Sequence, residues 1–110
     1  MPAAIERLNI VNPSANTNTV AFTSTGAYLV SVIATNKSST NNASISVWIA
    51  PGGTDTAGGR GYIASSLPLT VSNTYETIRF AANSGDVVRV EATTADVSFT
   101  VVGIDQAAAV

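Results

Sequence analysis

The segment Ser44–Ala50, with the sequence SISVWIA, has isoleucine or valine at every second position. In an extended chain, successive side chains point to opposite faces. Ile45, Val47 and Ile49 therefore share one face, while two serines and Trp48 share the other. This period of two, in β-branched residues, predicts a strand with one face in a hydrophobic core.

Similar patterns extend in both directions from this segment. Residues 27–35 are almost continuously apolar, which predicts a central strand buried on both faces. Residues 19–23 are predicted to form a strand with Val20 and Phe22 inward, and residues 5–11 to form an edge strand or an arm. Further strands are expected at residues 62–65, 69–72, 75–81, 87–93 and 97–104.

Glycine, proline and asparagine separate these segments and mark turns. Residues 36–42 are predicted to form an exposed loop because their composition is polar. Pro68 indicates an edge strand, because proline cannot donate a hydrogen bond to a neighbouring strand. Eight or nine short strands with regular turns predict an all-β fold, an antiparallel β-sandwich or a jelly-roll-like arrangement. The strand order cannot be read from the sequence.

The length fits a single domain over residues 1–110. Residues 1–14 are interpreted as an N-terminal arm and residues 105–110 as a short C-terminal tail. The first residues have no basic stretch followed by an apolar one, so a secretory leader is not expected. No apolar run reaches the roughly 18–20 residues that a membrane helix needs, so no membrane partner is expected either.

Composition argues against an enzyme. The chain of 110 residues has no histidine and no cysteine, and 11% of its residues are charged, compared with roughly 25% in average proteins. Side chains that move protons, attack carbonyl groups or bind transition metals are therefore scarce. We predict no catalytic residues, no cofactor and no metal site. The net charge of −2 also disfavours nucleic acid as a partner.

The glycine-rich stretch PGGTDTAGGRG, residues 51–61, is a candidate ligand loop by its composition. It has one carboxylate, Asp55, and lacks the spacing of a calcium loop. It also lacks the lysine and the following helix of a phosphate-binding loop. We therefore predict a flexible surface loop in which Arg60 contacts a carboxylate of a partner protein.

A chain with few charges and a mean hydropathy of +0.29 is prone to association, which favours a protein whose surface is covered by other subunits. Trp48 points to the serine-bearing face, where it is either packed under a loop or exposed as an interface anchor. The residues predicted to contact partners are Trp48, Arg60, Leu29, Ile33 and Val110.

Several short motifs from the middle of the chain to its end carry a resemblance. They are Pro51-Gly52-Gly53, Tyr62-Ile63, Leu67-Pro68, Asn73 to Glu76, Gly85-Asp86, Val88 to Val90 and Ser98 to Gly103. In this order they resemble a small β-sandwich module of virion structural proteins of tailed bacteriophages, cyanophages included. The resemblance covers about 60% of the chain, on the residues quoted, and implies a non-enzymatic virion component that is commonly oligomeric.

The resemblance and the composition lead to one expected function and two alternatives. The chain is expected to be a capsid decoration (cement) protein that bridges neighbouring capsomers. It would be a homo-oligomer, with a trimer favoured, bound to the major capsid protein. Its location would be the virion, after synthesis in the host cytoplasm. The first alternative is a neck, tail or fibre protein of the virion, and the second is a carbohydrate-binding β-sandwich.

Overall fold

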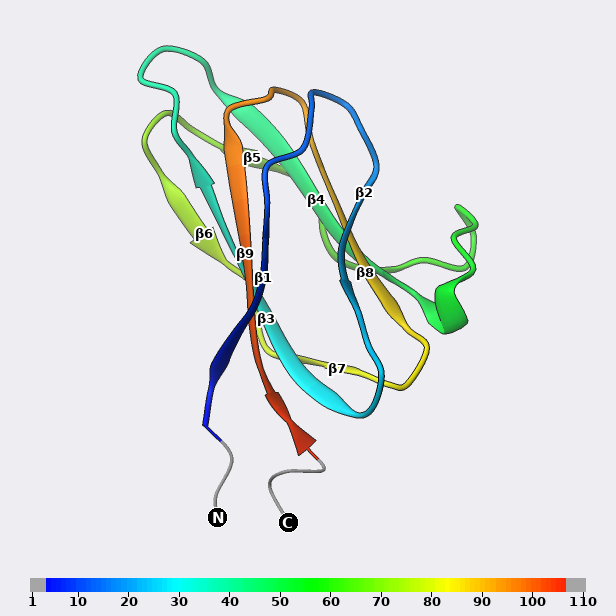
Figure 1. The fold of residues 1–110 in the computed structure, drawn as a ribbon. Helices are drawn as coiled ribbons and strands as arrows, with labels where there is room; N and C mark the ends of the chain where they lie inside the picture. Colours follow the sequence, from blue (N-terminus) through cyan, green and yellow to red (C-terminus); the bar gives the residue numbers. More distant parts are fainter. Residues whose placement is uncertain (1–3, 107–110) are drawn as a thin grey trace.

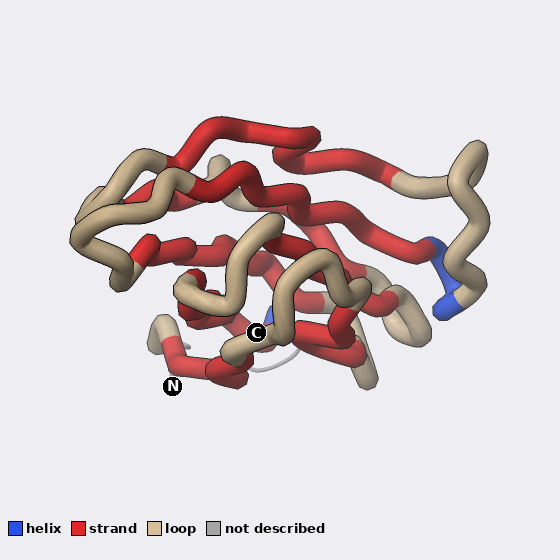
Figure 2. The backbone as a smooth tube through the Cα atoms, turned by 90° about the horizontal axis from the view of Figure 1, so that it is seen from above, coloured by secondary structure: helices blue, strands red, loops and turns tan. Residues whose placement is uncertain are grey.

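Nine strands in two antiparallel sheets make up the protein, in a computed structural model that describes residues 4–106. Figure 1 shows the path of the chain, and Figure 2 shows the strands from above, with the loop that contains the short helix η1 at one end. The elements are β1 (Glu6–Val11), β2 (Thr19–Thr23), β3 (Tyr28–Asn36), β4 (Ala43–Ala50), η1 (Pro51–Gly53), β5 (Gly61–Leu69), β6 (Thr74–Glu76), β7 (Phe80–Ala82), β8 (Val87–Ala92) and β9 (Val97–Asp105).

The strand order is that of a jelly roll. Sheet A has the order β1-β9-β3-β6, with β7 also paired to β3, and sheet B has the order β2-β8-β4-β5. Consecutive strands alternate between the sheets, except for the β4–β5 hairpin and the β6–β7 pair. Two sheets built in this way interlock two Greek keys. The predicted all-β antiparallel sandwich is confirmed.

The core lies between the sheets and is formed by every second residue of the central strands. β3 and β9 contribute one half of it and β4 and β8 the other, in a single cluster of buried side chains. Its largest fully buried members include Phe99 and Ile45, surrounded by valines. Burying one such side chain stabilises the fold by about 1.5–3 kcal/mol. The alternation of Ser44–Ala50 thus places its isoleucines and valine as predicted.

One inward assignment is wrong. Val20 of β2 is 41% exposed, and Ala21 is fully buried in its place. The pairing of β2 with β8 shifts between Val20 and Phe22. This irregularity adds a residue to one strand, so Ala21 and Phe22 both face the core and Val20 faces outward.

Two predicted strand boundaries also differ from the structure. Residues 61–69 form one strand, β5, which continues through Pro68 at the edge of sheet B. The predicted strand 75–81 is divided into β6 and β7. Between them, Thr77 accepts a hydrogen bond from the Val32 amide through its Oγ1 (3.0 Å), so a side chain replaces a backbone acceptor of the strand. Strand propensity cannot reveal that a side chain takes the place of a backbone acceptor in this way.

Asn36, predicted to begin an exposed loop, is fully buried at the end of β3. Its Nδ2 donates to the carbonyl oxygens of Asn41 (2.9 Å) and Leu69 (3.0 Å), and its Oδ1 accepts from the Ser38 amide (3.0 Å). These bonds satisfy a buried amide side chain and join two turns. Most of the following loop, residues 37–42, is exposed.

The predicted arm includes β1, which pairs with β9 at the edge of sheet A. The end of the predicted tail, with Val110, lies outside the described residues. Among residues 4–106, no helix is long and apolar enough to cross a membrane.

Gly103 provides a test of the sheet A geometry. A Cβ at this position would lie 2.6 Å from the Leu29 carbonyl oxygen and 2.9 Å from Leu8 Cδ1. We expect Gly103→Ala to reduce the free energy of unfolding by about 1–3 kcal/mol, because a backbone atom must move. Urea unfolding measures the change. Gly26→Ala is the matched control, since nothing lies within 4 Å of a Cβ there. Equal stability of the two variants would contradict the close approach.

Candidate functional site

The predicted contact residues lie on two opposite faces of the sandwich. Leu29 and Ile33 alternate with the core residues of β3 and so lie on the outer face of sheet A. Trp48 pairs with Arg89 of β8 and Tyr62 of β5, on the outer face of sheet B. The predicted set therefore does not form one continuous surface.

Trp48 is 0% exposed, although it lies outside the core cluster. Its ring packs against Tyr62, with 5.7 Å between ring centroids. The guanidinium of Arg60 lies 4.3 Å from the centroid on the ring, a cation–π contact. Of the two alternatives, the structure shows packing under a loop. The interface role of Trp48 is corrected accordingly, because a fully covered indole offers no surface to a partner.

The carboxylate of Asp55 holds this loop on sheet B. Its Oδ1 accepts hydrogen bonds from Trp48 Nε1 (3.0 Å) and Arg60 Nε (2.7 Å). Its Oδ2 accepts from Arg60 Nη2 (3.2 Å) and from Asn18 Nδ2 (2.7 Å). The arginine contact uses both oxygens, the strong bidentate arrangement. We call Trp48, Asp55, Arg60 and Tyr62 the Asp55 cluster.

Arg60 therefore pairs with a carboxylate of its own loop, in place of the partner carboxylate that was predicted. Its remaining donor, Nη1, is bonded to the Tyr62 hydroxyl (2.9 Å). Arg89 lies nearby, with Nε 3.9 Å from Asp55 Oδ2 and Nη1 bonded to Asn18 Oδ1 (3.0 Å). The Nε of Arg89 is buried without a hydrogen-bond partner within residues 4–106.

These donors lower the pKa of Asp55 from its ordinary 3.8 to about 2, chiefly through the hydrogen bond from Arg60 and then that from Asn18, while burial acts in the opposite direction. The same pair raises the pKa of Arg60. Asp55 is thus ionised at neutral pH, and both of its oxygens accept hydrogen bonds from neighbouring side chains. No group of three potential metal-ligating side chains occurs among the described residues.

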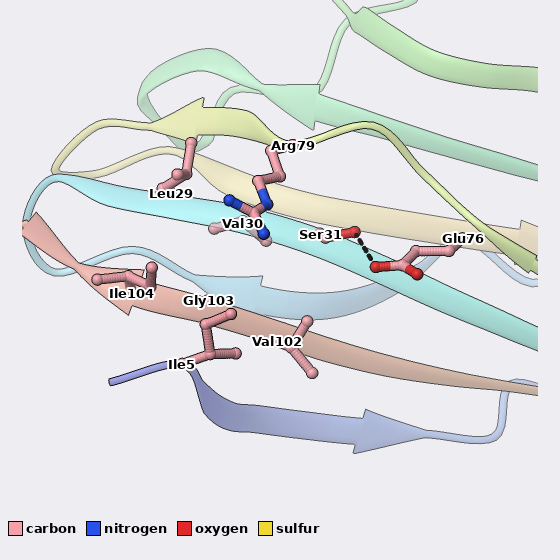
Figure 3. Close-up of a pocket in the computed structure, with 9 residues that line it drawn as sticks. All are labelled: Ile5, Leu29, Val30, Ser31, Glu76, Arg79, Val102, Gly103 and Ile104. Carbon is pink, nitrogen blue, oxygen red and sulfur yellow. Dashed lines mark hydrogen bonds between the residues drawn. The ribbon is translucent and has the colours of Figure 1, made fainter. Parts of the chain in front are cut away.

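The outer face of sheet A has a different character. The register pairs Leu29 with Ile104 and Ser31 with Val102, all on this side of the sheet. Together with Ile5 they line a shallow hollow of about 50 Å³. Figure 3 shows Ile5, Val102 and Ile104 on one side of β3 and Arg79 and Glu76 on the other.

Apolar side chains continue beyond the hollow. Ile5 is 58% exposed and Ile78, in the link between β6 and β7, is 74% exposed. Ile10 of β1, opposite Thr100 on β9, is also exposed. The run 27–35, predicted to be buried on both faces, packs on the core with one face, while on the other face Leu29 and Ile33 are half-buried and Ser31 is buried beside Glu76. We call Ile5, Leu29, Ile33, Val102 and Ile104 the apolar stripe. This stripe on the outer face of sheet A is the candidate contact surface.

Sequence reasoning missed three parts of these sites. The sequence indicates no partner for Asp55, because strand alternation does not show that the loop after β4 folds back onto Trp48. Tyr62 was assigned only to a strand. Val102 and Ile104 could have been found, because they alternate with the core residues of β9 in the same way that Leu29 does on β3.

The fold and its sites define an antiparallel jelly-roll domain with an apolar stripe on the outer face of sheet A and a polar hollow on the outer face of sheet B. Comparison with protein-family models, with curated proteins and with solved structures gives no match for this chain.

The Asp55 cluster predicts how stability depends on pH. Because the folded-state pKa of Asp55 is lowered, its contribution is present above the ordinary 3.8 and is lost as the pH falls toward about 2. We expect Asp55→Asn to be less stable than the parent protein at neutral pH, with the difference narrowing below the ordinary carboxyl pKa. Urea unfolding, followed by the fluorescence of the sole tryptophan, measures this.

Asp96→Asn is the control, because no side-chain hydrogen bond of Asp96 to residues 4–106 is present. It should show no such narrowing. A stability difference for Asp55→Asn that is equally large at neutral and strongly acidic pH would contradict the role of the charge.

Proposed function

We propose that this chain is a non-enzymatic structural protein that self-associates through the outer face of sheet A. The observation that carries the proposal is the apolar stripe along β3 and β9, with Leu29 and Ile104 at its centre. A half-buried apolar stripe of this kind, with the exposed Ile5 at its edge, favours burial against other protein on a chain with few charges.

The charges around the stripe favour a second copy as the occupant. Arg7 lies on the β1 side, opposite Val102, and Glu76 lies with Arg79 on the β6 side, opposite Ile33. A ring in which the β1 side of one copy meets the β6 side of the next would pair Arg7 with Glu76. A single contact repeated in this way suits a cyclic homo-oligomer, and the trimer stays a prediction.

Virion membership is proposed from the resemblance of the motifs between residues 51 and 103. Its leading form is a capsid decoration protein, made in the host cytoplasm and bound to the major capsid protein at capsomer junctions. A neck, tail or fibre component is the alternative within the virion. A structural role also agrees with the chemistry of the Asp55 cluster, where the carboxylate is fully engaged by donors and so cannot act as a base.

Self-association is tested by mass in solution. Sedimentation velocity should give the unmodified chain a mass above that of one copy throughout the micromolar range. Ile5→Asp and Ile104→Asp, both on the stripe, should shift it toward a single copy, because each would bury an unpaired charge. Val20→Asp, on the outer face of sheet B, is the control and should assemble normally. A monomeric parent protein, or equal effects of all three variants, would refute the contact surface.

The location in the virion is tested by stoichiometry. Quantitative mass spectrometry of purified particles should find this chain at a copy number that scales with the number of capsomers. Copies sufficient only for a single ring would favour the neck, tail or fibre alternative. Absence from purified particles would overturn virion membership altogether.

A further inference from the structure

The outer face of sheet B carries a second and larger hollow, of about 230 Å³. Its lining includes Ser46 of β4, Tyr62 and Ser66 of β5, Glu91 of β8 and Asn16 from the turn before β2. Ser46 and Glu91 are paired in the register of β4 with β8. Hydroxyl, amide and carboxylate groups from four segments thus converge on one space, with one aromatic ring at its border.

The backbone around this hollow is held in uncommon conformations. Asn16 (φ 56°) and Ser66 (φ 48°) are two of the three non-glycine residues with left-handed backbone within residues 4–106. At Ser66 the amide donates to Ser46 Oγ (3.0 Å), beside the irregular pairing of β4 and β5. Bulges and left-handed residues of this kind gather at binding sites, because they redirect side chains at some cost in energy.

The other members of the Asp55 cluster hold Tyr62 both at its ring and at its hydroxyl group. Its ring packs on Trp48, and its hydroxyl is bonded to Arg60 Nη1, which Asp55 in turn holds in place. Yet Tyr62 is 46% exposed. A ring that is already immobile loses little conformational entropy when a ligand packs on it. The buried Trp48 thus supports a preformed aromatic platform beside the hollow.

The chemistry of the lining selects the ligand. Stacking on Tyr62 requires a flat apolar face, and the serines, Asn16 and Glu91 require several hydroxyl groups. Sugar rings offer both. The carboxylate of Glu91 has no partner among the described residues and would repel anionic ligands, while Arg60 and Arg89 are turned toward Asp55. The volume lies below the roughly 300–1,000 Å³ typical of drug-sized ligands, which suits one sugar unit of a chain.

We propose that this hollow binds a neutral saccharide unit, with the sugar ring stacked on Tyr62 and its hydroxyl groups bonded to Glu91 and to the serines of β4 and β5. The inference does not depend on the proposed function, because the hollow and the apolar stripe lie on opposite faces of the sandwich.

The test is a titration of the ¹⁵N-labelled protein with maltohexaose, cellohexaose and N-acetylchitohexaose, followed by NMR. The single indole N–H signal of Trp48 reports on the cluster, and the amide signals of residues 61–66 report on the hollow. At millimolar sugar, at least one of these neutral chains should shift both sets of signals. Sialyllactose, which is anionic, should not.

Variants separate the proposed site from nonspecific contact. Tyr62→Ala should weaken binding about tenfold, the loss expected for one aromatic contact, and Tyr62→Phe should retain most of it because the ring remains. Glu91→Gln should weaken binding of the neutral chain and relieve the exclusion of sialyllactose. Val20→Ala, on the same face but away from the lining, is the control.

Two outcomes would overturn the inference. One is the absence of shifts with all three neutral chains at millimolar concentration, and the other is binding that Tyr62→Ala leaves unchanged. Neither result depends on the mass of the oligomer, so failure of this inference and failure of self-association are told apart.

Discussion

A sandwich of two sheets has two inner faces that cover one another and two outer faces that must be stabilised in some other way. The period-two alternation of β3, β4, β8 and β9 fills the space between the sheets with valine, alanine, isoleucine and phenylalanine. Every second residue of the same strands is thereby directed outward. The differences between this chain and a generic sandwich arise from how those outward residues are accommodated.

On sheet B, the largest outward side chain is covered by another part of the same chain. Its outward tryptophan is covered by the loop after β4, and Asp55 secures that loop through Arg60 and the indole N–H. Two of the five basic residues, Arg60 and Arg89, are gathered around this carboxylate. On the outer face of sheet A, Leu29 and Ile104 are only half-buried, and they line one hollow together with Glu76 and Arg79.

Local patterns predicted what local physics determines. Alternation located β4, its buried residues and the opposite direction of Trp48, because side-chain direction in a strand follows from the backbone alone. Alternation gave wrong predictions where contact with a strand or residue distant in the sequence determined which way a side chain faces. Val20 faces outward because β2 is irregular against β8, and Asn36 is buried because Leu69, 33 residues later, accepts its hydrogen bond. The Asp55 cluster was hidden for a different reason, since its members are close in sequence but meet only because the loop after β4 folds back onto Trp48.

The two outer faces require different chemistry from whatever contacts them. A face of leucine and isoleucine is stabilised by excluding water, which another protein surface does well and a sugar does poorly. A hollow of hydroxyl, amide and carboxylate groups is stabilised by directional hydrogen bonds, and burying it under an apolar surface would leave those groups unsatisfied. Because the faces point in opposite directions, assembly through sheet A would leave the hollow beside Tyr62 open on the outside of the assembly. The arrangement of polar and apolar residues along the strands therefore favours one partner for each face.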